Sequence, residues 1–330
     1  MRRLTQGRPL REQLADDVRA GFGRSPKVLP PKYLYDERGS ELFETITELP
    51  EYYPTRTEAT ILSAHVDRLV EDIRPEELVE LGSGSSRKTR MLLEAMHRSG
   101  SGNRYVPLEI SETALEGAAL ELLDDYPWLE VHGHLGDFAT DLPSVSRSGR
   151  RIIAFLGSTI GNLLPAARAA LLERVADSMQ PGDVFLLGAD LVKSPATLVP
   201  AYDDAAGVTA DFNRNMLTVL NRELDGDLPV DAFEHRAVWN AGEARIEMHL
   251  VAREEVTGRL DAIELDVRFA PGEPLVTEYS CKFEVAGLTG ELGVAGLETA
   301  EVWTDDRRWF SVFVARRTDS SAPADQYGGG

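Results

Sequence analysis

Apolar and polar positions follow two different patterns along the chain. In the first two thirds, five short apolar runs rich in β-forming residues alternate with stretches whose apolar positions have helical spacing. The runs are 78–81, 104–110, 129–135, 151–157 and 183–190. Because strand and helix alternate, this part predicts βαβ units that build a parallel sheet.

The alternation stops near Leu191. A polar helical region follows at 197–224, and alternating apolar positions at 245–256 and 259–270 predict antiparallel strands. A helix, a strand, a tight polar turn at 305–308 and a last strand then return to the first sheet. We therefore expect an α/β fold, Rossmann-like, with a mostly parallel seven-stranded sheet and an inserted second α+β unit.

Two segments lie outside these patterns. Residues before Thr57 lack the parallel-sheet pattern and are rich in Pro, Tyr and Gly, so we expect them to pack with the inserted unit and cover the mouth of the sheet. The tail at 318–330 has low complexity, and we expect it to be disordered.

Composition narrows the possible partners. The 330 residues carry a formal net charge of −20, which disfavours nucleic acid, and no apolar run approaches the roughly 18 residues that cross a bilayer. Cys281 is the only cysteine, so the chain has no disulfide and no cysteine cluster for a metal. The N-terminus lacks the apolar core of a secretory signal, and we expect a cytoplasmic protein.

A glycine turn follows the first strand. It reads "GSGSSR" from Gly82, so Gly82 and Gly84 let the backbone approach a ligand while Arg87 stands where a dinucleotide fingerprint has its third glycine. NAD is thus disfavoured but left open, and the spacing disfavours a Walker loop more strongly. The preceding acid, Glu80, would repel phosphate and attract a cation.

A cationic, adenosine-bearing ligand without phosphates meets these conditions, and S-adenosylmethionine (SAM) is the candidate. Glu109 closes the second predicted strand, where a carboxylate takes ribose hydroxyls. Asp137 follows the third run and could accept from the adenine amine, with Phe138 packed on the ring. Their order on a parallel sheet predicts a class I methyltransferase.

Several blocks of the sequence are specific to one family. These are "LPPKYLYDERGSELFETITELPEYYPTRTEATIL", "VELGSGSSRKTRMLLEAM", "FLGSTIGNL", "LLGADLVK", "AYDDAAGVTADFNRN" and "TEYSCKF". From about residue 10 to 317 the chain closely resembles the histidine Nα-methyltransferases of ergothioneine biosynthesis. That family trimethylates the α-amino group of L-histidine to hercynine.

The resemblance implies a division of the chain and a small-molecule substrate, L-histidine. It places a SAM-dependent methyltransferase domain at 57–191 and 283–317, and a substrate-binding domain at 8–56 and 192–282. The tail at 318–330 belongs to neither. We expect a monomer and no metal.

The resemblance also implies site residues. The methyl donor would be contacted by Gly82, Lys88, Glu109, Asp137 and Phe138, although the family pattern has Asp at the position of Glu109. On the acceptor side, Tyr52 and Tyr202 would hold the histidine carboxylate, Asn162 and Tyr35 the reacting amine, and Glu278, Ser280 and Met248 the imidazole.

These assignments fit the chemistry of methyl transfer. The reaction needs a neutral amine aligned with the sulfonium methyl, and an amide oxygen of Asn162 can orient the amine without adding charge. Tyr35 is a poor base at its ordinary pKa, so we expect it to orient the amine with Asn162. A methyltransferase for another amino acid or small amine, and a ligand-binding homologue without turnover, remain alternatives.

Two further features admit catalytic interpretations. His132 and His134 alternate in a predicted strand and so would share a face, but no third metal ligand is evident nearby. Cys281 could serve as a nucleophile, yet transfer to an amine needs none, so a packed thiol is the simpler interpretation.

Overall fold

The computed structural model describes residues 2–3, 9–82, 87–110, 112–142 and 145–318. Gly84 and nearly all of the tail predicted to be disordered lie outside these described residues.

The larger sheet contains nine strands within the described part of the chain. They are β1 (Arg2–Arg3), β3 (Glu77–Leu81), β4 (Arg104–Glu109), β5 (Glu130–Val131), β6 (His134–Leu135), β7 (Arg151–Phe155), β8 (Val184–Asp190), β14 (Leu297–Thr304) and β15 (Phe310–Arg317). Their order is β1-β6-β4-β3-β7-β8-β15-β14, with β5 beside β4. Neighbours are parallel as far as β8, whereas β15 is antiparallel to both β8 and β14.

The predicted α/β class is confirmed, but the expected count of seven strands differs from the nine found. The predicted third strand is interrupted at His132 and Gly133 and forms the separate strands β5 and β6, while β1 adds an edge strand. Every residue of β3, β7 and β8 is buried. Helices cover both faces of these strands, which explains why they appear in the sequence as continuous apolar runs.

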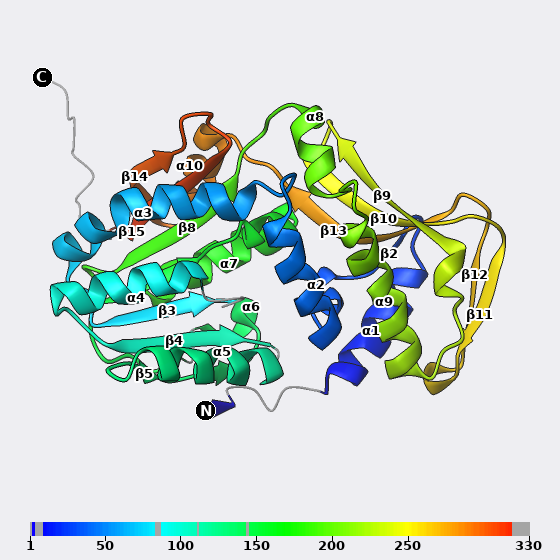
Figure 1. The fold of residues 1–330 in the computed structure, drawn as a ribbon, viewed down its shortest axis with the longest axis horizontal. Coiled ribbons are helices and arrows are strands. Elements are labelled where there is room, and N and C mark those ends of the chain that lie inside the picture. Colours follow the sequence, from blue (N-terminus) through cyan, green and yellow to red (C-terminus); the bar gives the residue numbers. More distant parts are fainter. Residues whose placement is uncertain (1, 4–8, 83–86, 111, 143–144, 319–330) are drawn as a thin grey trace, which may run out of the picture.

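Helices from distant parts of the chain cover the two faces of the sheet (Figure 1). Those described here are α3 (Pro54–Ile73), α4 (Arg87–Ser99), α5 (Glu112–Asp125), α6 (Phe138–Asp141), α7 (Pro165–Ser178) and α10 (Val285–Val294). Apolar residues of α3 and α4 form one core cluster with the sheet, and those of α7 and α10 form another. Proline begins α3 and α7, where its missing N–H costs no helical hydrogen bond.

A second, four-stranded sheet lies beside the first (Figure 1). Its strands are β2 (Lys27–Val28), β13 (Pro274–Cys281), β10 (Arg245–Ala252) and β9 (Phe233–Asn240), in that order. β2 is parallel to β13, and the other pairs are antiparallel. A separate hairpin joins β11 (Val256–Leu260) to β12 (Leu265–Phe269). The N-terminal segment therefore shares a sheet with the inserted unit.

Helices pack against this second sheet and complete its core. They are α1 (Leu10–Phe22), α2 (Glu37–Glu48), α8 (Pro195–Leu198) and α9 (Val208–Leu224). One cluster of buried residues joins α1, α2 and α9 with β9, β10 and β13. At the start of α2, the Asp36 side chain accepts from the Gly39 N–H at 2.8 Å, and it also accepts from Asn215 of α9 at 2.7 Å.

The two sheets meet at the ends of β7 and β8. A short 3-10 helix, η3 (Thr159–Asn162), follows β7 and lies against β13. A Cβ at Gly161 would lie 2.8 Å from the Cys281 carbonyl oxygen, so only glycine allows this approach. After β8, Leu191 forms a parallel bridge with Phe283. Among the described helices, none is long and apolar enough to span a membrane.

Candidate active site

The carboxyl ends of three parallel strands line up at one edge, which we call the strand-end edge. Gly82 directly follows β3 with a positive φ of 73°, and its N–H donates to the Leu108 carbonyl of β4 at 3.0 Å. The Gly136 N–H after β6 donates to the Glu109 carbonyl at 2.9 Å. A Cβ at Gly82 would meet nothing within 4 Å, so the backbone borders open space.

The polar residues predicted for this edge lie at its strand ends. A carboxylate oxygen of Glu109 accepts from the Ile110 N–H at 2.9 Å. Asp137 is exposed and directly precedes α6, where its N–H donates to Asp141 at 2.8 Å. The half-buried ring of Phe138 lies 5.2 Å from that of Phe155. The structure thus brings the predicted residues of β3, β4 and α6 to one edge.

Lys88 is tied to a residue that the sequence did not suggest. Its ammonium forms an ion pair with Glu58 of α3, whose side chain is fully buried. The same carboxylate accepts from the Gly157 N–H after β7, at 2.9 and 3.0 Å for its two oxygens. Glu58 therefore joins the first turn of α4 to the loop that follows β7.

Glu80 does not face a ligand at this edge, and that expectation was wrong. Its buried carboxylate accepts from Thr89 of α4 at 2.7 and 2.9 Å and from the hydroxyl of Tyr105. Burial raises the pKa of Glu80 to about 7, although both hydroxyls oppose the shift. The side chain lies between β3 and α4, so it gives no information on the charge of a ligand.

The loop after β7 holds Asn162 against β13. Gly157 and Ser158 both have positive φ, and the Ser158 hydroxyl accepts from the Asp190 N–H at 2.9 Å. The Asn162 amide donates to the Tyr279 carbonyl at 2.8 Å, and its side chain lowers the pKa of Glu278 against the larger effect of burial. This loop therefore links the strand-end edge to β13.

Glu278, Ser280 and Lys282 occupy alternate positions of β13 and its end, so they project from the same face. We call this the β13 face, and Met248 of β10 stands directly opposite Glu278 in the register. Glu278 is only 8% exposed, and burial raises its pKa to about 7 despite Lys282 and Asn162. No cation among the described residues lies within ion-pair distance of its carboxylate.

The three predicted tyrosines surround the β13 face. The Tyr52 ring lies 6.3 Å from that of Tyr202, and the Tyr35 ring packs edge-on against Phe43 and Phe212, each at 5.4 Å. Burial raises the pKa of both Tyr35 and Tyr52, and the negative charge of Glu278 raises them further. Both phenols are therefore neutral near pH 7 and act as hydrogen-bonding groups, not as bases.

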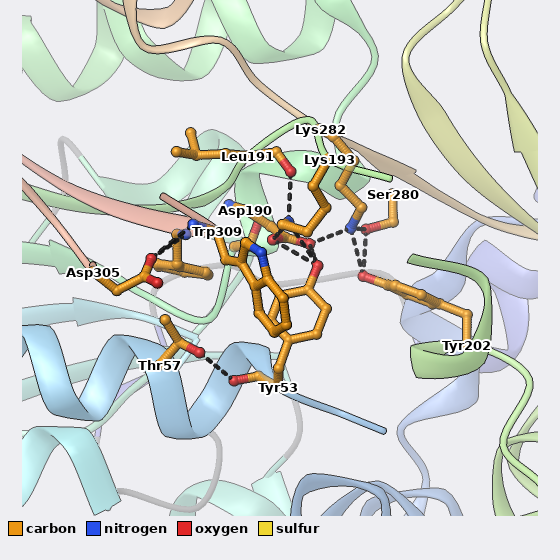
Figure 2. Close-up of polar contacts among 12 residues, drawn as sticks. Tyr53, Thr57, Asp190, Leu191, Lys193, Tyr202, Ser280, Lys282, Asp305 and Trp309 are labelled. Atoms are coloured by element: carbon orange, nitrogen blue, oxygen red, sulfur yellow. Dashed lines mark hydrogen bonds and ion pairs between the residues drawn. The ribbon is translucent and has the colours of Figure 1, made fainter. Parts of the chain in front are cut away.

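A buried ionic network adjoins Tyr202 and Ser280 (Figure 2). Asp190 accepts from Lys282 at 2.9 Å, from the Tyr53 hydroxyl at 2.8 and 2.9 Å, and from Lys193. On its other side, Lys282 donates to the hydroxyls of Tyr202 at 2.7 Å and Ser280 at 2.9 Å. The hydroxyls of Tyr202 and Ser280 are 2.8 Å apart.

Sequence reasoning did not assign a role to Asp190 or Lys282. Both lie in quoted blocks, "LLGADLVK" and "TEYSCKF", and a charged residue at the end of an apolar strand was the available signal. Burial alone would lower the pKa of Lys282, but the attraction of Asp190 and Tyr202 raises it above its ordinary value. Lys282 is thus a permanent buried cation beside the Tyr202 hydroxyl.

Tyr35 senses acids of both regions. Burial raises the pKa of its hydroxyl, and the negative charges of Glu278 on the β13 face and Glu109 at the strand-end edge raise that pKa further. By contrast, a cavity of about 840 Å³ lies between α3, α8 and the turn at 304–307, and no predicted site residue lines it.

The two histidines considered as metal ligands do not share a face. His134 is buried in β6, whereas His132 lies in the interruption before it and is exposed, with Glu130 at 3.7 Å. The described residues contain no group of three or more His, Cys, Asp or Glu side chains that could hold a metal ion.

Comparison with known proteins points to one family. Residues 14–317 match the family model described as "Histidine-specific methyltransferase, SAM-dependent". The chain is 51% identical to a histidine N-alpha-methyltransferase of Mycolicibacterium smegmatis over 93% of its length and 95% of that protein. It is 49% identical to that of Mycobacterium tuberculosis, over 92% and 95%. Ergothioneine biosynthesis protein 1 of Neurospora crassa is 36% identical over 84% of this chain and 32% of that protein.

Proposed function

The chain belongs to the family of histidine-specific, SAM-dependent methyltransferases, and from this premise we propose that it converts L-histidine to hercynine. Three methyl groups pass from SAM to the α-amino group, as a step of ergothioneine biosynthesis. The observation that carries this substrate choice is Glu278, a buried carboxylate without a cationic partner among the described residues, beside an amide and three phenols. An imidazole supplies the missing hydrogen-bond donor.

The strand-end edge suits a sulfonium nucleoside. Gly82 leaves the backbone open, Glu109 offers a carboxylate to the ribose hydroxyls, and Asp137 and Phe138 offer an acceptor and a ring face to adenine. SAM supplies the electrophilic methyl group when bound there. Lys88 has two roles in this proposal. Its ion pair with Glu58 holds the first turn of α4 against the loop after β7, and its side chain also contacts the methyl donor.

The β13 face and the tyrosines suit histidine. We assign the imidazole to Glu278 and Ser280, with Met248 as the wall of that pocket, because the three side chains lie together on one face. The carboxylate is assigned to the hydroxyls of Tyr52 and Tyr202. This arrangement leaves the α-amine to Asn162, in the loop after β7, and to Tyr35, whose pKa is raised by the charges of both Glu278 and Glu109.

Asn162 can orient the amine through its amide oxygen. Its amide nitrogen donates to the Tyr279 carbonyl, which fixes the side chain, and the amide oxygen is the atom that can accept an N–H. Accepting that hydrogen aims the nitrogen lone pair along the remaining direction, toward the methyl donor. Tyr35 adds a second neutral contact, since its raised pKa prevents it from acting as a base near pH 7.

We further propose the division into a catalytic part, 57–191 with 283–317, and a substrate part, 8–56 with 192–282. The shared core of the N-terminal segment and the insertion supports this division. A cytoplasmic monomer is the simplest state for such an enzyme, and light scattering coupled to gel filtration tests the monomer directly.

Mass spectrometry of the protein incubated with SAM and an equimolar mixture of the twenty amino acids tests the function. We expect only histidine to gain methyl groups, up to three. Methylation of another component would keep the methyl-donor site and reject the acceptor assignment, and binding without product would indicate a ligand-binding homologue.

A pair of tyrosine variants tests how the amine is held. Tyr35→Phe removes the proposed contact with the amine and should lower kcat by about 10-fold, the loss of one hydrogen bond in the transition state. The control is Tyr33→Phe, because the Tyr33 hydroxyl donates to Asp17 of α1 at 2.7 Å and is not assigned to the substrate. Equal effects of the two variants on kcat would contradict the role of Tyr35.

A further inference from the structure

Lys282 uses its three ammonium hydrogens in one enclosed arrangement. Its side chain is fully buried, and its nitrogen lies 2.9 Å from Asp190, 2.7 Å from the Tyr202 hydroxyl and 2.9 Å from the Ser280 hydroxyl. It also lies 4.5 Å from the centre of the Tyr202 ring. A lysine ammonium has no acceptor, so both hydroxyls receive a hydrogen from it and must direct their own hydrogens elsewhere.

This arrangement leaves one hydroxyl hydrogen for a ligand. Tyr202 and Ser280 are 2.8 Å apart, so one of them donates to the other. The remaining hydrogen has no acceptor among the residues of the network drawn in Figure 2, so it is available to a ligand. Because the hydroxyl oxygens already accept from Lys282, the group that meets this hydrogen must itself be an acceptor, and an anion is favoured.

The charges of the network also favour an anion. Among the residues that the structure describes, Asp190 is the carboxylate that bonds both Lys282 and Lys193, so the three groups together carry one excess positive charge. Tyr53 donates to the same carboxylate and adds no charge. Glu278 acts on Lys282 only through its field, and no hydrogen bond or ion pair joins them among the described contacts. A carboxylate at the Tyr202 hydroxyl would compensate the excess.

We propose that Lys282 is the residue that makes the enzyme require a free α-carboxylate on its substrate, acting through the hydroxyls of Tyr202 and Ser280. It is a positioning residue, because it does not itself touch the reacting atoms. The proposal rests on the proposed function, in which Tyr202 holds that carboxylate. The role of Lys282 extends the proposed function, because it names the charge that makes the enzyme select amino acids over amines, amides and esters.

Lys193 provides a matched comparison. It has the same charge and the same carboxylate partner as Lys282, and its ammonium also bonds the Tyr53 hydroxyl at 2.7 Å. It has no bond to Tyr202 or Ser280. If only the net charge of the network mattered, replacing either lysine would have the same effect on substrate choice.

The first experiment uses the wild-type enzyme with two competitors. Imidazole propionate keeps the carboxylate of histidine and lacks the amine, whereas histamine keeps the amine and lacks the carboxylate. We expect imidazole propionate to compete with histidine at least about 10-fold better, as for a charge-assisted hydrogen bond. Equal inhibition by both would overturn the proposal without any variant.

The second experiment measures kcat/KM for histidine and for histidinamide in Lys282→Met and Lys193→Met. The preference for histidine should fall about 10- to 100-fold in Lys282→Met, mainly through KM, and by a clearly smaller factor in Lys193→Met, which removes the excess charge but no hydrogen bond to Tyr202 or Ser280. Affinity for S-adenosylhomocysteine should be unchanged in both. An unchanged preference in Lys282→Met, or equal losses in the two variants, would overturn the proposal.

A variant that keeps a hydrogen-bond donor separates charge from packing. Lys282→Gln removes the charge and retains an N–H group, and we expect it to lose the preference for the carboxylate nearly as fully as Lys282→Met. Retention of that preference would contradict the role of the charge. If the wild-type enzyme itself formed no methylhistidine, the proposed function would fail, and that result is distinct from either outcome with the variants.

Discussion

The strand-end edge and the β13 face are built on different principles. At the strand-end edge, the ends of β3, β4 and β6 are placed by the register of one parallel sheet, and ligand groups would meet backbone and a few exposed acids. At the β13 face, the side chains of Glu278, Ser280 and Lys282 are buried and held by contacts between distant segments. A shared cofactor can be bound by the first type of site, whereas selection of one amino acid needs the second.

The difference has a physical reason. In a parallel sheet, the backbone register alone aligns the carboxyl ends of neighbouring strands. The strand-end edge therefore forms without polar contacts between distant side chains. Buried charges must instead be paired and hydrogen-bonded, which fixes each neighbour of the β13 face. Changes at the edge should therefore affect binding of the methyl donor, while changes behind β13 should affect both stability and choice of acceptor.

The largest effect is expected from the carboxylate that joins the two lysines. Asp190→Ala leaves Lys282 and Lys193 without their shared partner and should lower the free energy of unfolding by about 3 to 5 kcal/mol, measured by urea denaturation. The control is Asp266→Asn, because Asp266 is exposed and pairs with Arg259 at 2.7 Å on the surface. This variant should lower the free energy of unfolding by no more than about 1 kcal/mol. Similar losses in both variants would show that the buried network does not differ from a surface pair.

A smaller effect is expected at the strand-end edge. Glu109→Ala removes the carboxylate proposed to bind the ribose, and the Kd for S-adenosylhomocysteine should rise about 10- to 100-fold by calorimetry. Thermal stability should change little. Glu116→Ala, at an exposed position of α5, is the control and should leave the Kd unchanged. If Glu109→Ala altered histidine selectivity but not binding of the methyl donor, the separation of the two regions would be wrong.

Two buried acids have raised pKa values: Glu80 on β3, beneath the strand-end edge, and Glu278 on the β13 face. Their glutamine variants should change stability with pH in the same way but differ in function. Both pKa values are about 7 in the folded protein, above the ordinary value of 4.5, so the folded state retains protons that the unfolded state has lost between these pH values. Each acid therefore makes the protein less stable as pH rises from about 4.5 to 7. Glu80→Gln and Glu278→Gln should each gain about 1 to 3 kcal/mol relative to wild type across that window.

The two glutamine variants should then differ in function. Histidine affinity should fall in Glu278→Gln and stay unchanged in Glu80→Gln, because Glu80 is satisfied by Thr89 and Tyr105 under α4. Titration of both variants with histidine at pH 8 measures this. Equal losses of affinity would mean that Glu278 is also only a structural acid.

The smallest effect is expected at Cys281, a buried thiol on β13 that we expect to take no part in the chemistry. Cys281→Ala should cost about 1 kcal/mol of stability and leave kcat/KM within about threefold of wild type. A loss of activity of several orders of magnitude would indicate a nucleophile and contradict direct transfer to the amine. Stability by urea denaturation and initial rates of methylation provide the two measurements.

Much of the first sheet could be predicted from the sequence. Strands β3, β4, β7 and β8 correspond to continuous apolar runs because both of their faces are buried. The strand β13 could not be found in this way. It is also mostly buried, but Thr277, Glu278 and Ser280 are polar. These residues interrupt the apolar run from which a buried strand would be predicted.

The same division holds for the site. Gly82, Glu109 and Asp137 could be proposed from their order at the ends of successive strands, since a parallel sheet aligns such ends. Glu58, Asp190 and Lys282 could not, because each acts on a residue far away in the chain: Glu58 on Gly157, and Asp190 on Lys282. Pairing between distant segments is visible only in the folded structure.

The most direct test compares wild type with Glu278→Ala across the twenty amino acids, by measuring kcat/KM for each amino acid and the Kd for S-adenosylhomocysteine. We predict that the preference for histidine falls about 10- to 100-fold while the Kd for S-adenosylhomocysteine stays the same. An unchanged preference for histidine, or a loss of S-adenosylhomocysteine binding of the same size, would contradict the claim that the β13 face selects the acceptor.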